Sequence, residues 1–168
     1  MTVLNKTKLA RAFYDRDTLM VARELLGKYL VFRQNNKEKI GRIVETEAYK
    51  GFDDTASHAH GRKTARNAIM YGPPGYAYIY IIYGIYHCLN MVTEREGYPA
   101  AVLIRALELP AAEGPGKLCR VLDLTRRQNG IDLLSTMLYV LNAPNPKENI
   151  VATPRIGVDY AGPSKDLP

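Results

Sequence analysis

Residues 76–92, YAYIYIIYGIYHCLNMV, are the strongest β-strand signal in the chain and anchor the expected fold. The run is rich in β-branched and aromatic residues, and tyrosine recurs at every second position from Tyr76 to Tyr80, which is the period of a strand. Gly84 would let the segment fold back as a hairpin with Tyr83 near its tip. The alternative is one long strand with a bulge at the same glycine.

The residues on either side of this run show helix and strand patterns without the regular alternation of a doubly wound fold. Helices are expected at 17–27, capped by Asp17 or Thr18, and at 65–72 and 114–124. Strands are expected at 28–32, 40–49, 100–109, 136–142 and 148–154, and a polar loop at 50–64. The pattern favours an α+β fold with an antiparallel or mixed sheet.

The composition is that of a globular protein and excludes disordered and membrane-spanning classes. With 168 residues, 46% hydrophobic and 24% charged, the chain can bury a substantial core and is unlike a disordered protein. It has no run of 18 apolar residues and no signal-peptide core, so no membrane association is expected. Two cysteines, Cys88 and Cys119, indicate a reduced, cytoplasmic protein. The net charge of +6 leaves polyanions such as nucleic acid open as partners.

Two carboxylates, Glu45 and Glu47, lie two residues apart in an otherwise apolar predicted strand, so their side chains should share one face. One interpretation is an exposed face, or salt bridges to Arg42 and nearby lysines. The other is a catalytic carboxylate beside a structural one. Arg105 favours the second interpretation, because it lies in the apolar run 100–109 and an ion pair between strands would satisfy both groups. A purely structural ion pair would have the same sequence pattern.

Six tyrosines lie between residues 71 and 86. Alternating tyrosines form either one face of an ordinary sheet or a platform on which nucleic-acid bases stack. Tyr83, near the expected hairpin tip, has little of its own chain to pack against. It is either a wedge inserted into a partner or a side chain that packs on a neighbouring loop.

Metal and cofactor chemistry have little support. His58 and His60 have H-x-H spacing, but no second pair of ligands follows at a suitable distance, so no metal is expected. The chain has neither a dinucleotide-binding glycine fingerprint nor a Walker loop, and it has no G-x-S-x-G nucleophile elbow. No cofactor is therefore expected.

Several blocks occur in a specific order: GRIVETEAYKGFDD (41–54), SHAHGRKTARN (57–67), YAYIYIIYGIYHCLNMV (76–92), AVLIRALE (101–108), GPGKLCRVLDL (114–124) and TPRIGVDYAG (153–162). Together they closely resemble the alkyladenine DNA glycosylase family, the 3-methyladenine glycosylases of the mammalian type. The resemblance covers nearly the whole chain. It implies an α+β fold: a single compact domain over residues 1–168 with a mostly antiparallel sheet and a protruding, tyrosine-tipped hairpin. It also implies a monofunctional glycosylase that flips a damaged purine out of the duplex and hydrolyses its N-glycosidic bond without metal or cofactor. Known substrates of such proteins include 3-methyladenine, 7-methylguanine, hypoxanthine and ethenoadenine.

The resemblance also assigns roles to matching residues. It makes Glu47 the general base for the attacking water, Arg105 its helper at the water and the adjacent phosphate, and Glu45 a structural carboxylate. The implied base pocket has Tyr49 on one face of the flipped base and His58 and Tyr80 on the other. Asn90 would line the pocket at the position that a guanine amino group would occupy, and would discriminate for or against that group. The implied DNA wedge is Tyr83 flanked by Ile85 and Tyr86, and residues from Arg62 to Thr64 would touch the DNA backbone.

The same resemblance implies a partner and a setting. The expected partner is double-stranded DNA that contains damaged purines, bound by a monomer. The expected location is the bacterial cytoplasm in association with the nucleoid, or the nucleus of a eukaryote. The family usually continues past DLP (166–168) with an aromatic and basic tail, so a truncated or naturally short C-terminal tail is expected.

Two other functions remain as alternatives. A non-catalytic nucleic-acid binder would keep the tyrosine platform but would have no need of Glu47 and Arg105. A nucleosidase or glycosidase would release bases or sugars from small molecules. A glycosidase, however, needs two carboxylates that flank the bond, whereas Glu45 and Glu47 lie side by side.

Overall fold

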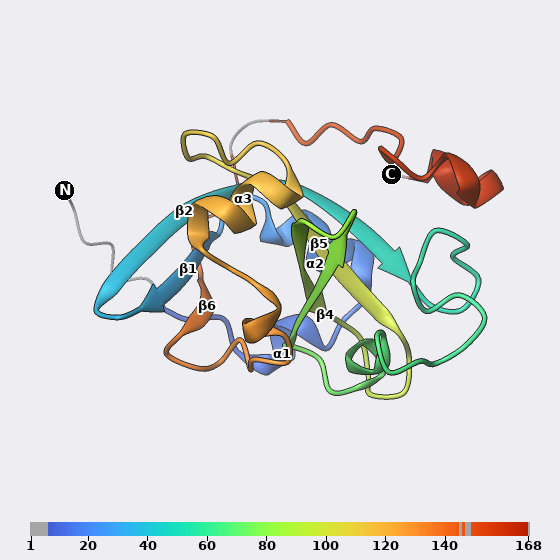
Figure 1. The fold of residues 1–168 in the computed structure, drawn as a ribbon, viewed down its shortest axis with the longest axis horizontal. Coiled ribbons are helices and arrows are strands. Elements are labelled where there is room, and N and C mark those ends of the chain that lie inside the picture. The colour runs from blue at the N-terminus through green and yellow to red at the C-terminus, as the bar shows by residue number, and fades with distance from the viewer. Residues whose placement is uncertain (1–6, 145, 147–148, 168) are drawn as a thin grey trace.

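A six-stranded antiparallel sheet, curled around a hydrophobic core, organises the chain (Figure 1). The computed structural model describes residues 7–144, 146 and 149–167. The strands lie in the order β3-β4-β5-β2-β1-β6, so β3 and β6 form the two edges. Their bounds are β1 Tyr29–Gln34, β2 Lys37–Lys50, β3 Ala77–Ile82, β4 Tyr86–Val92, β5 Ala100–Leu107 and β6 Leu138–Leu141. The prediction of an α+β domain with an antiparallel sheet is confirmed.

Short helices complete the fold. The α-helices are α1 Arg11–Tyr14, α2 Thr18–Leu25 and α3 Pro115–Leu122, and the 3-10 helices are η1 Ala68–Tyr71, η2 Arg126–Gln128 and η3 Asp159–Asp166. As expected, Asp17 caps α2: its carboxylate accepts hydrogen bonds from the backbone N–H groups of residues 19 and 20. The buried face of α2 consists of Thr18, Val21, Ala22 and Leu25, whereas Leu19 is 44% exposed. No helix among the described residues is long and apolar enough to cross a membrane.

Residues 76–92 form a hairpin rather than one long strand. β3 and β4 pair from Ala77 opposite Met91 to Ile82 opposite Tyr86. At the tip, the N–H of Ile85 donates to the carbonyl of Ile82 over 3.2 Å. Tyr83 (φ 51°) and Gly84 (φ 71°) both adopt the left-handed conformation that a type I′ turn requires.

Strand alternation divides the side chains between two faces of the sheet. One face packs against α2 and α3 to form the main core. This core includes Ala48, Ile79, Leu89 and Ile104 from the sheet and Leu118 from α3. The other face carries the polar and aromatic residues. The strand register places Glu47 opposite Leu103, Leu103 opposite Asn90, and Asn90 opposite Tyr78. This row runs across β2, β5, β4 and β3, and it is the floor on which the candidate site is built.

Two expected elements differ from the structure. The helix expected at 65–72 is a single 3-10 turn, Ala68–Tyr71. The strand expected at 148–154 is wrong for its described part, because 149–154 form no strand, and position 148 lies outside the described residues. Its apolar side chains do not drive sheet pairing, since Ile150 is 51% and Val151 77% exposed. The segment instead leads to the C-terminal η3, which lies beside the loop 50–64 (Figure 1).

Candidate active site

A cavity of about 480 Å³ opens on the polar face of the sheet, within the range of small-ligand sites. The sequence-predicted residues that line it are Tyr49, His58, Tyr80, Tyr83, Asn90 and Arg105. They come from β2, the loop 50–64, the β3–β4 hairpin and β5. Because β5 and β4 separate β2 from β3 in the sheet, Tyr49 and Tyr80 flank a floor that includes Asn90 and Leu103.

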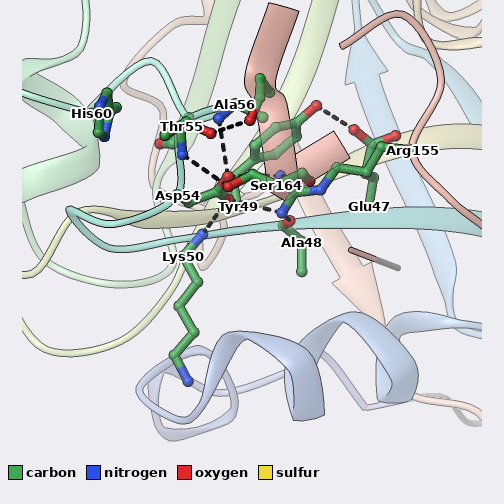
Figure 2. Close-up of polar contacts among 12 residues, drawn as sticks. Glu47, Ala48, Tyr49, Lys50, Asp54, Thr55, Ala56, His60, Arg155 and Ser164 are labelled. Carbon is green, nitrogen blue, oxygen red and sulfur yellow. Dashed lines mark hydrogen bonds and ion pairs between the residues drawn. The ribbon is translucent and has the colours of Figure 1, made fainter. Parts of the chain in front are cut away.

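Glu47 is a buried carboxylate with two fixed partners. Its side chain is only 5% exposed. Nη1 of Arg105 donates to one carboxylate oxygen over 2.9 Å. The hydroxyl of Tyr49 donates to the other oxygen (Figure 2). Nε of Arg105 donates to Glu45 over 2.7 Å, and the side chain of Glu45 is 49% exposed. The two glutamates therefore share one cation but differ sharply in their access to solvent.

Glu47 lies where two cavities meet. Glu47 is not among the residues that line the larger cavity, but it lines a smaller one of about 170 Å³ between α2, β2 and residues 150–156. Arg105 and Ile156 line both cavities, which places the Glu47–Arg105 pair at their junction. A group held by Glu47 can thus approach a ligand in the larger cavity from one side.

An aromatic cluster forms the wall on the β3 side. The rings of His58 and Tyr80 lie edge to face with centroids 4.3 Å apart, and the rings of Tyr78 and Tyr80 are 5.4 Å apart. Nδ1 of His58 is 3.0 Å from the hydroxyl of Tyr78. Burial, assisted by the nearby positive charge of Arg66, lowers the pKa of His58 to about 4. The imidazole is therefore neutral at physiological pH.

Asn90 is a buried amide with a fixed orientation. Its side chain is 3% exposed, and Nδ2 donates to the carbonyl oxygens of Tyr78 (3.2 Å) and Cys88 (3.4 Å). An amide held in this way is a rigid part of the cavity floor, and it can discriminate between ligands by shape and hydrogen bonding.

The hairpin tip presents large apolar side chains to solvent. Tyr83 is 87% and Ile85 65% exposed. Tyr86 instead packs against α3 at Gly116, where an added Cβ would lie 2.8 Å from the Tyr86 ring. The hairpin therefore stands on α3, and of its three predicted wedge residues only Tyr83 also lines the cavity.

The predicted backbone-contact residues lie outside the cavity. Arg62 and Thr64 are exposed in a loop organised by the buried Asn67, whose Nδ2 donates to the carbonyls of His58 (2.7 Å) and Arg62 (3.0 Å). Arg66, two residues beyond Thr64, does line the cavity, and its guanidinium lies 5.5 Å from the Tyr80 ring centroid.

Among the residues that the sequence did not assign to the site, Arg66, Tyr78 and Arg155 contact its predicted residues Tyr80, His58 and Tyr49, respectively. Arg66 ends the basic run RKTAR (62–66), and such a cluster of positive charge indicates a contact with nucleic acid. Tyr78 was visible only as one member of the tyrosine alternation, although it contacts His58 directly. Arg155 stacks on Tyr49, with Cζ 4.7 Å from the ring centroid, and only folding brings it there from the C-terminal segment.

The histidine pair does not converge on a common point. His58 faces the Tyr78 hydroxyl, whereas Nδ1 of His60 lies 2.8 Å from the carbonyl oxygen of Phe52. Among the described residues, no group of three or more His, Cys, Asp or Glu side chains is arranged to hold a metal ion.

Similarity to known proteins identifies the family. Residues 12–167 match the family described as methylpurine-DNA glycosylase (MPG). The chain belongs to this family. It is therefore a DNA glycosylase, a hydrolase that takes part in DNA repair.

Several relatives are similar over most of their length. A protein of Anaeromyxobacter sp. (strain Fw109-5) is 54% identical over 167 residues, which cover 96% of this chain and 86% of the relative. A Legionella pneumophila (strain Corby) protein is 51% identical over 160 residues, covering 92% and 87%. A Methanocella arvoryzae protein is 53% identical over 174 residues, covering 92% and 86%. Each bears the name "Putative 3-methyladenine DNA glycosylase".

Proposed function

We propose that this glycosylase acts as a monomer on duplex DNA, extrudes a damaged purine and cleaves its N-glycosidic bond with a water activated by Glu47. The substrate class is alkylated or deaminated purines: 3-methyladenine, 7-methylguanine, hypoxanthine and ethenoadenine. The observation that carries the proposal is the Glu47 carboxylate, buried between Arg105 and Tyr49 at the edge of an aromatic cavity.

Base extrusion is the first step, because an atom inside the base stack is out of reach of Glu47. Unpairing and unstacking a nucleotide cost a few kcal/mol, and least for a damaged base. The exposed Tyr83 ring fills the vacated space and offsets part of that cost. Arg62, Thr64 and Arg66 contact the DNA backbone beside the cavity. The net charge of +6 adds affinity that does not depend on sequence.

Bond cleavage follows from the position of Glu47. The base fills the larger cavity, and the water on Glu47 approaches C1′ from the side of the smaller one, opposite the leaving base. Glu47 accepts a proton from this water as its oxygen bonds to C1′. The electron pair of the broken C1′–N bond leaves with the base. The ionised carboxylate also stabilises the positive charge that develops on the sugar.

The cavity suits a cationic purine. A base alkylated at N3 or N7 carries positive charge, which is attracted to the faces of Tyr49 and Tyr80. His58, neutral because burial lowers its pKa to about 4, adds no positive charge to those of Arg66 and Arg105 in the lining. The same low pKa means that His58 carries no surplus proton at pH 7 with which to assist a neutral leaving base. Asn90 makes the floor less favourable for an exocyclic guanine amino group, so 7-methylguanine is accepted but disfavoured.

The test is base release from defined substrates. Duplexes with a single hypoxanthine or ethenoadenine, together with alkylated genomic DNA, are incubated with enzyme, and the released bases are identified by mass. We expect release from DNA and none from the corresponding free nucleosides. Release from nucleosides alone would instead indicate a nucleosidase, and tight lesion binding without release would indicate a damage-binding protein.

A further inference from the structure

An ion pair buried beneath Tyr49 connects three parts of the chain. Arg155 comes from the C-terminal segment and Asp54 from the loop 50–64, and their side chains are only 3% and 4% exposed. The two groups bond in bidentate fashion: Nη1 of Arg155 lies 2.7 Å from Oδ1 of Asp54, and Nη2 lies 2.8 Å from Oδ2. Such a planar, two-point contact fixes orientation as well as charge.

The remaining contacts of Arg155 reach the site itself. Nη2 also donates to the carbonyl of Ala48 over 2.6 Å, and Nη1 to the carbonyl of Ser164 over 3.3 Å (Figure 2). Ala48 is the residue between Glu47 and Tyr49. The guanidinium carbon lies 4.7 Å from the centroid of the Tyr49 ring. Arg155 therefore holds both the backbone and the ring of the predicted stacking tyrosine.

Asp54 is itself rigidly placed. Its carboxylate accepts hydrogen bonds from the backbone N–H groups of Lys50 and Ala56, each over 3.1 Å. These bonds anchor the pair at the start of the loop that carries His58. Directly after Arg155, residues 156–158 line the larger cavity. One guanidinium thus sets the relative position of Tyr49, the loop 50–64 and the C-terminal wall of the cavity.

We propose that Arg155 is a positioning residue for the glycosylase reaction. It fixes the plane of the Tyr49 ring against the flipped base and holds residues 156–158 in the cavity wall. This inference rests on the proposed function, in that it assumes a base stacked on Tyr49. Lys cannot replace Arg155 here. An ammonium group lacks the planar set of N–H donors with which the guanidinium pairs with Asp54, donates to the Ala48 carbonyl and stacks on the Tyr49 ring at the same time.

The test compares Arg155→Lys with Arg11→Lys. Arg11 makes similar contacts away from the cavity: it pairs with Asp132 over 2.6 Å, donates to the carbonyl of Pro74 over 2.7 Å and lies 5.0 Å from the Tyr76 ring centroid. Both variants are measured for Tm, for single-turnover release of ethenoadenine at saturating enzyme, and for emission of the bound lesion. Ethenoadenine is fluorescent, so its emission reports stacking directly.

We expect Arg155→Lys to lower the single-turnover rate about 10- to 100-fold and to shift the emission of the bound lesion toward that of an unstacked base. Arg11→Lys should lower Tm but keep the single-turnover rate and the lesion emission of the wild type. Equal losses in both variants, in proportion to Tm, would overturn the proposal, because they would show a merely structural role. So would wild-type emission and rate in Arg155→Lys.

Two further variants keep the proposal open to refutation if Arg155→Lys folds poorly. Asp54→Asn removes the charge partner but leaves the contacts of Arg155 with Ala48 and the ring available, and a smaller loss of rate is expected. In a Tyr49→Ala background, Asp54→Asn should cause little additional loss if the pair acts through Tyr49. Fully additive losses would contradict the proposal. Failure of the wild type to release any base would refute the proposed function, whereas the lesion emission would still report on Arg155.

Discussion

At the scale of single residues, the site depends on charges placed in apolar strands. Glu47 and Arg105 could be paired from the sequence because each was conspicuous in an apolar run, and the structure joins them over 2.9 Å. The pair of Arg155 and Asp54 could not be predicted, since neither lies in an apolar run and 101 residues separate them. A charge in a polar segment gives no sign that folding will bury it.

The Tyr49 hydroxyl gives the first prediction at this scale. Burial, together with the neighbouring Glu47 charge, raises the pKa of Tyr49, so it stays a hydrogen-bond donor to Glu47 well above neutral pH. Tyr49→Phe keeps the ring but removes this bond to a charged group, a contact of about 1.5–3 kcal/mol. We expect a roughly tenfold or larger loss in single-turnover rate with nearly unchanged lesion affinity. A larger effect on affinity than on rate would argue against the bond.

His58 gives a prediction about stability. Its pKa is about 4 in the folded protein, lowered by burial and by Arg66, against 6.5 when exposed. Between these values the unfolded chain binds a proton that the folded protein does not, so the free energy of unfolding falls as pH drops from about 6.5 to about 4. Above about 6.5 His58 contributes no pH dependence.

His58→Gln should abolish this contribution. The Tm advantage of the wild type over the variant, measured by thermal denaturation, is expected to shrink as pH is lowered from 7 toward 4.5. A difference in Tm that stays constant over this range would mean that His58 titrates normally in the folded state.

At the scale of elements, the β3–β4 hairpin was the most predictable feature, and it carries Tyr83, which is 87% exposed. Its aromatic alternation and its Gly84 indicated two strands and a tip. The register that aligns Glu47, Leu103, Asn90 and Tyr78 across four strands was beyond sequence reasoning, because pairing between distant strands has no local signature. The strand expected at 148–154 was wrong for a related reason: apolar β-formers pair only where a sheet edge receives them.

Tyr83 occupies a conformation that disfavours it. A non-glycine residue with φ 51° is strained, and asparagine tolerates the left-handed region better. Tyr83→Asn should therefore raise the free energy of unfolding by up to about 1 kcal/mol while weakening binding to lesion duplexes several-fold. Denaturant titration measures the free energy of unfolding, and fluorescence anisotropy measures the affinity for lesion duplexes. Unchanged lesion affinity would rule out the wedge.

At the scale of the whole molecule, net charge and its placement govern DNA binding. The composition predicted a basic protein but not which face is used. Arg66 lines the cavity, whereas Lys37 does not and begins β2. The turn that joins β1 and β2 lies apart from the β3–β4 hairpin (Figure 1).

The two cations make a matched pair of substitutions. Each phosphate contact adds about 0.9 to the negative slope of log K against log salt concentration. Arg66→Gln should make this slope less negative by about one contact, and Lys37→Gln should leave it as in the wild type, although both remove one positive charge. Equal slopes for the two variants would show that only the net charge matters.

The measurement that tests the central claim most directly is single-turnover base release by Glu47→Gln beside Glu45→Gln. Both glutamates contact Arg105, but Glu47 is 5% exposed and the side chain of Glu45 49%. Glu47→Gln is expected to bind lesion duplexes yet release no detectable base, whereas Glu45→Gln keeps most of the wild-type rate. Wild-type release by a folded Glu47→Gln protein would contradict the assignment of Glu47 as the catalytic base.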